Sequence, residues 1–104
     1  MSAFTSIESA TEPVIGEARV LNKITAHHTM IVTVEGGVTS LLVRMQGSHD
    51  GVRWTDIGTF QAPQSGMMSN PPTTHLMAHV RARLLTITGT DAVCSVSIAS
   101  ADDA

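Results

Sequence analysis

The stretch Leu41–Phe60, with the sequence LLVRMQGSHDGVRWTDIGTF, constrains the fold of this chain more than any other. Apolar residues stand at every second position of its first half, which is the period of a strand with one face in a core. The step Asp50-Gly51 supplies the positive φ angles that a tight reversal needs. The chain then returns through a second apolar run that contains Trp54, Ile57 and Phe60. The pattern predicts a β-hairpin.

Further short alternating runs, separated by turn residues, extend the prediction to the rest of the chain. They span Val14–Thr25, Met30–Glu35, His75–Thr88 and Val93–Ala99. Turns are expected at Gly36-Gly37 and at Thr88–Asp91, because glycine and aspartate tolerate the backbone angles of a reversal. No segment shows apolar periodicity of helix length. We therefore expect an all-β fold, a small antiparallel β-sandwich or barrel.

The 104 residues suffice for one domain with one core. We assign residues 14–100 to a single β-sandwich domain. The polar segment Met1–Pro13 is predicted to be an extended N-terminal arm, and residues 101–104 form a short acidic tail. The longest irregular stretch is Ala62–Thr74, whose prolines and glycine disfavour regular hydrogen bonding.

Two of these segments carry apolar residues that suggest contact with a partner. In the arm, Phe4 and Ile7 belong either to a loose terminus or to an arm that docks on a neighbouring subunit. In the irregular stretch, Met67 and Met68 either fold back over the core or form an adaptable contact surface, since methionine packs against irregular shapes. We take all four as candidate partner-binding residues and leave both alternatives open.

The charge pattern narrows the classes of partner. Charged residues make up 14% of the chain, against about 25% in typical globular domains, and low surface charge favours association into a homo-oligomer. The net charge is −3, and the basic residues are scattered apart from Arg81 and Arg83, which have no aromatic residue interleaved with them. Nucleic-acid binding is therefore disfavoured. The chain shows neither a signal peptide nor a run of about 20 apolar residues, so we expect a protein made in the cytoplasm with no membrane association.

The residues that most often carry chemistry form no recognisable catalytic or metal motif. His75 and His79 have a spacing known from zinc sites on helices, but on a strand these positions lie about 13 Å apart. The single cysteine, Cys94, lies in an apolar run and is expected to be buried. Trp54 either covers the end of the core, which we favour, or offers a stacking platform for a sugar ring. We predict a protein that is not an enzyme and has no cofactor or metal.

The segment GSHDGVRWTDIG resembles a recurring hairpin of small β-sandwich virion proteins from tailed bacteriophages, and RARLLTITGT resembles the end of such domains. The resemblance covers Leu41–Phe60 and Val80–Ile98. It implies a capsid decoration or cement subunit located in the virion, which stabilises the head shell as a homo-oligomer bound to the major capsid protein or other virion proteins. Alternatives are a tail or head–tail connector component and a carbohydrate-binding module, because a similar hairpin occurs in the longer discoidin-like domains. The matching residues shape the hairpin and carry no active site: Gly47, Ser48, Asp50, Gly51, Trp54, Ile57 and Gly58.

Overall fold

The computed structural model describes residues 2–25, 28–62, 64–69 and 77–100, and the regular elements in these ranges are all strands. This confirms the predicted all-β class. The seven strands are β1 (Ser2–Ala10), β2 (Val14–Ile15), β3 (Arg19–Thr25), β4 (His28–Ser48), β5 (Thr55–Phe60), β6 (Gly66–Ser69) and β7 (Met77–Ser100).

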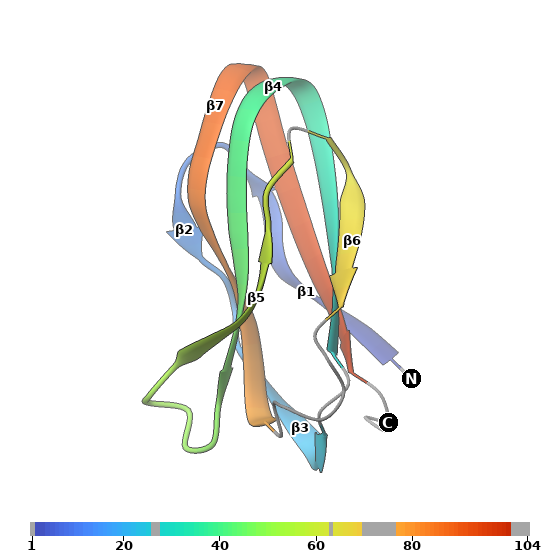
Figure 1. The fold of residues 1–104 in the computed structure, drawn as a ribbon, viewed down its shortest axis with the longest axis vertical. Helices are drawn as coiled ribbons and strands as arrows, with labels where there is room; N and C mark the ends of the chain where they lie inside the picture. The colour runs from blue at the N-terminus through green and yellow to red at the C-terminus, as the bar shows by residue number, and fades with distance from the viewer. Residues whose placement is uncertain (1, 26–27, 63, 70–76, 101–104) are drawn as a thin grey trace.

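The two longest strands, β4 and β7, form an antiparallel ribbon that folds over on itself (Figure 1). Their pairing runs from His28 opposite Ser100 to Ser48 opposite His79. The turns predicted at Gly36-Gly37 and at Thr88–Asp91 are instead bends within these continuous strands. Because both strands bend at the same level, one half of the ribbon packs against the other half.

Backbone angles that favour glycine allow the bend. Gly36 has a φ of +82° and Gly89 a φ of +139°, while Asp91 adopts a φ of +54°. The β4–β7 register shifts on both sides of the bend, between Glu35 and Gly37 and between Val38 and Ser40. These shifts are bulges, which increase local curvature. Glycine therefore lets the ribbon reverse direction without losing its pairing.

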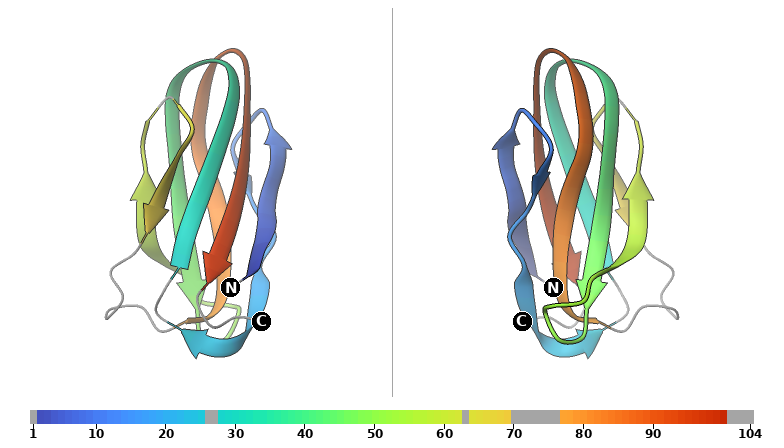
Figure 2. Two further views of the ribbon diagram at one scale, coloured as in Figure 1. Left: turned by 90° about the vertical axis from the view of Figure 1, so that its right-hand side faces the viewer. Right: turned by 90° about the vertical axis from the view of Figure 1, so that its left-hand side faces the viewer.

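Strand pairs on either side of the bend complete two layers, so the predicted sandwich is confirmed. In the first layer β1 pairs with the second half of β7, which pairs with the first half of β4, which pairs with β6. In the second layer β2 and β3 pair with the first half of β7, and β5 pairs with the second half of β4. Figure 2 shows the two halves of each long strand in different layers.

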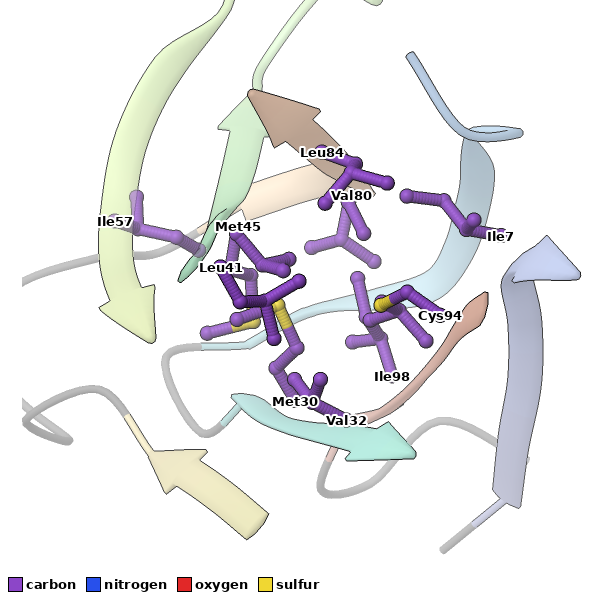
Figure 3. Close-up of a cluster of buried hydrophobic side chains, with 13 residues drawn as sticks. Ile7, Met30, Val32, Leu41, Met45, Ile57, Val80, Leu84, Cys94 and Ile98 are labelled. Carbon is purple, nitrogen blue, oxygen red and sulfur yellow. The ribbon is translucent and has the colours of Figure 1, made fainter. Parts of the chain in front are cut away.

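The core lies between the layers and draws on the alternating residues of the ribbon (Figure 3). Met30, Val43 and Met45 are fully buried, and β7 contributes Val80 and Ile98 with no exposed surface. The alternating apolar side chains of Leu41–Phe60 thus face the core. The β4–β5 pairing, from Val43 opposite Phe60 to Gly47 opposite Thr55, confirms the predicted hairpin.

The N-terminal segment differs from the expected arm. Ser2–Ala10 is strand β1 of the first layer, and the side chain of Ile7 is only 3% exposed within the core cluster. The Ser6 hydroxyl donates to the carbonyl of Glu17 at 2.7 Å and accepts the backbone N–H of Ala82 at 2.9 Å, which ties the segment to the second layer. The polar composition misled the prediction because an edge strand buries few of its side chains.

The irregular stretch also differs in part, since Gly66–Ser69 forms strand β6 against β4. The acidic tail, 101–104, lies outside the described residues.

Candidate functional site

The outer surface of the second layer gathers three arginines. Gln46 pairs with Arg81 and Arg44 pairs with Arg83, whereas the intervening pair, Met45 and Ala82, points into the core. Because neighbouring residues of a strand face opposite sides of a sheet, Arg44, Arg81 and Arg83 share the outer surface. We call these three residues the arginine face.

A chain of polar contacts crosses this face. Arg44 forms an ion pair with Asp56, with 3.1 Å between Nη1 and Oδ2, and Gln46 Nε2 donates to the other carboxylate oxygen at 2.9 Å. Arg81 Nε donates to Gln46 Oε1 at 2.9 Å. Burial, with a smaller contribution from the nearby charge of Arg83, lowers the pKa of Arg81. The contacts fix the orientation of side chains that a sheet surface alone would leave free.

Trp54 completes this arrangement and does not belong to the core, contrary to the favoured interpretation of its sequence context. Its side chain is half-buried, and the guanidinium carbon of Arg81 lies 4.0 Å from the centre of its ring. The ring of His79 meets it edge-on at 6.4 Å between centroids. The sequence has no aromatic residue next to Arg81 and Arg83. The contact could not be seen there because the hairpin brings Trp54 to Arg81 from 27 positions away.

The hairpin turn is fixed by two side chains. Ser48 Oγ accepts the backbone N–H of Gly51 at 2.9 Å, and Asp50 Oδ1 accepts those of Val52 and Arg53 at 2.8 and 2.9 Å. Hydrogen bonds from these backbone groups lower the pKa of Asp50 to about 2. The Asp50 carboxylate is thus used in forming the turn.

The outer surface of the first layer has a different character. Thr5, Ser97, Ile31 and Met67 are successive partners in one row across all four strands of this layer. The adjoining outward pairs along the ribbon, Thr29–Ala99 and Thr33–Ser95, are also uncharged. We call these three rows the hydroxyl face. Covering these rows with another protein requires no removal of water from a charged group within them.

The four candidate partner-binding residues are distributed differently from the expectation. Ile7 is a core residue and is therefore unavailable to a partner in the folded chain, and Phe4 is half-buried against the core, with Arg19 at 5.6 Å from its ring centre. Met67 is 70% exposed at one end of the hydroxyl face. The side chain of Met68 lies outside the described residues.

The described histidines, cysteine and carboxylates do not gather into a site for a metal ion. His28 is 1% exposed and His79 is half-buried, while His27 and His75 lie outside the described residues. Burial raises the pKa of the Cys94 thiol to about 11. The described part of the chain also contains no helix that could span a membrane.

Comparisons with known proteins place the fold among prophage-derived proteins. The sequence matches no protein family model and no curated protein. The crystal structure of YomS, from the SPBc2 prophage, is similar with a TM-score of 0.62 and 19% identity over 96% of this chain and 92% of YomS. The crystal structure of XepA, a PBSX exported protein, gives a TM-score of 0.69 and 16% identity over 95% of this chain but only 37% of XepA. At these identities the similarity establishes the fold.

Proposed function

We propose that this protein is a phage-encoded structural protein that acts by binding other virion proteins, as a capsid decoration or cement subunit. The similarity to two prophage-derived proteins over nearly the whole chain supports the phage association. The resemblance of the Leu41–Phe60 hairpin to phage virion proteins supports the structural role. On this proposal the protein has no enzymatic activity and is located in the virion, with the major capsid protein as its partner.

The hydroxyl face is the observation that carries the proposal. One of its rows extends across all four strands of the layer, its two other rows are pairs between β4 and β7, and none of these residues is charged. Met67 adds an exposed, flexible apolar group at one end. Removing water from such a surface costs little free energy, because it carries no charged group in its rows. Methionine adapts to the shape of a partner. Many copies attached to the shell through this face would bury surface area across the junctions between capsid subunits. This buried area would resist separation of the capsid subunits.

Co-sedimentation with undecorated capsids of the encoding phage tests the proposal. Ile31→Lys places a charge at the centre of the hydroxyl face and should abolish attachment. Val52→Lys is the matched control, because Val52 is an exposed β-branched residue in the hairpin turn, away from that face. Both variants should melt near the temperature of the parent. If the parent does not sediment with capsids, or if Ile31→Lys attaches as well as Val52→Lys, the proposal is wrong.

Carbohydrate binding on the virion surface is a second candidate, favoured by the position of Trp54 outside the core, stacked on Arg81, which also donates to Gln46. A glycan array separates the candidates: binding that Trp54→Ala abolishes would favour the second one.

A further inference from the structure

The positive charge of the arginine face is only partly neutralised by described residues of the same subunit. Arg44 and Arg83 are direct cross-strand partners, and Arg81 lies two residues from Arg83 on the same side, about 7 Å away. Like charges directly opposite each other destabilise a sheet. Asp56 offsets the charge of Arg44, but within the described part of the chain the guanidinium of Arg83 makes no hydrogen bond or ion pair. A carboxylate from outside the subunit would relieve this repulsion.

Exposed apolar residues adjoin the free arginine. Ile15, on β2, is the cross-strand partner of Arg83 and is 52% exposed, and its neighbour Val14 is 41% exposed. Together with Pro13 and Arg83 these residues line a shallow hollow of about 300 Å³. Arginine beside apolar surface is characteristic of protein interfaces. This combination favours a protein partner over a hydrated polysaccharide, which would leave the apolar side chains unused.

A surface with the complementary character lies on the same chain. Residues 8–17, which we call the acidic segment, expose Glu8, Glu12 and Glu17 and line a second hollow of about 430 Å³. The segment includes Val14 and Ile15, so it presents apolar groups between its carboxylates. Among the described residues no ion pair joins these carboxylates to the arginine face. Each subunit therefore offers both halves of a charge-complementary contact.

We propose that the arginine face docks on the acidic segment of a second copy of this chain. In this contact Arg83 meets the carboxylate of Glu12, and the exposed Ile15, the cross-strand partner of Arg83, is covered at its centre. The contact goes beyond the proposed function and centres on Arg83 and Ile15 of the second layer: the hydroxyl face of the first layer would join a subunit to the shell, and the arginine face would join subunits to one another.

Sedimentation equilibrium of the full chain, across a range of salt concentrations, tests the contact. The parent should self-associate at micromolar concentration, more weakly as salt rises, because salt screens exposed charges. Arg83→Glu and Glu12→Arg should each raise the dissociation constant at least about tenfold, as expected for close interfacial charge pairs. The two changes combined in one chain restore opposite charges at the contact and should recover most of the association.

Glu35→Arg is the matched control for Glu12→Arg, because it reverses an exposed glutamate near the bend of the ribbon, and it should leave association unchanged. Melting temperatures show whether each variant is folded. A parent that is monomeric at every salt concentration overturns the inference, and so does a double variant that associates no better than the single ones. A monomer that still binds capsids contradicts this contact alone, whereas self-association without capsid binding contradicts only the proposed function.

Discussion

Gly36 and Asp91 approach each other so closely across the bent ribbon that a Cβ atom on Gly36 would overlap the carbonyl oxygen of Asp91. Gly36 also has a φ of +82°, in the region that side chains disfavour. Gly37, the next residue, has only ordinary contacts at its Cβ position, the nearest at 3.5 Å. The reversal of the ribbon therefore depends on the first glycine of the pair more than on the second.

Gly36→Ala should lower the free energy of unfolding by about 2–4 kcal/mol, since the substitution combines an unfavourable φ with a backbone overlap. Gly37→Ala should change it by less than about 1 kcal/mol. Urea unfolding followed by circular dichroism measures both values. Equal effects of the two substitutions would contradict the account of the bend.

Removal of the N-terminal strand should unfold the domain. Deletion of residues 1–11 takes away the core residue Ile7 and the Ser6 hydroxyl that bonds to Glu17 and Ala82. The milder Ile7→Ala should cost about 2–4 kcal/mol, as truncation of a buried aliphatic side chain does. The Glu8→Gln variant, at an exposed position of the same strand, is the control. A truncated chain with an unchanged melting temperature would show that the segment is a dispensable arm after all.

Trp54→Ala should cost only about 1–2 kcal/mol, because Trp54 is half-buried and its stacking on Arg81 is a surface contact. Ile98→Ala, at a position with no exposed surface, should cost about 2–5 kcal/mol. Denaturant titration of both variants compares the two losses. If Trp54→Ala is the more destabilising substitution, Trp54 belongs to the core in solution.

The turn carboxylate should make the stability of the hairpin dependent on pH. The pKa of Asp50 falls from 3.8 to about 2 in the folded chain, so its ionised form favours folding at pH values above the unfolded pKa. That contribution is lost as the pH falls from about 4 through 2. The stability advantage of the parent over Asp50→Asn should therefore be constant above pH 5 and shrink toward pH 2. A difference that does not vary with pH would contradict the role of the charge.

Cys94 should be unreactive in the folded protein. Its side chain has no exposed surface, and burial raises the pKa of the thiol to about 11, so little thiolate forms near neutral pH. Labelling with iodoacetamide should proceed only as fast as the domain unfolds, and should become rapid in denaturant. Fast labelling under native conditions would show that β7 opens around Cys94.

Local sequence patterns determined the segments that form β2, β3, β4, β5 and β7, the hairpin and its turn. Apolar alternation reports which side chains of a strand face a core, and the Asp50-Gly51 step reports a reversal, because both depend on residues close together in the chain. The low proportion of charged residues predicted contact with other protein, but composition could not place an uncharged surface on the layer that contains β1 and β6.

The tertiary structure alone decided three other features: the membership of β1 in the sheet, the continuity of β4 and β7 through their bends, and the gathering of Arg44, Arg81 and Arg83 on one face, where Trp54 stacks on Arg81. Each depends on pairing between residues far apart in the sequence, such as Thr5 with Ser97 and Arg44 with Arg83. Apolar residues alternate with a period of two in an isolated arm, in a separate strand and in half of a folded ribbon, so this pattern does not distinguish the three. The choice among these three structures depends on which segment covers the apolar side. It also depends on glycines, which allow the backbone to bend without ending the strand.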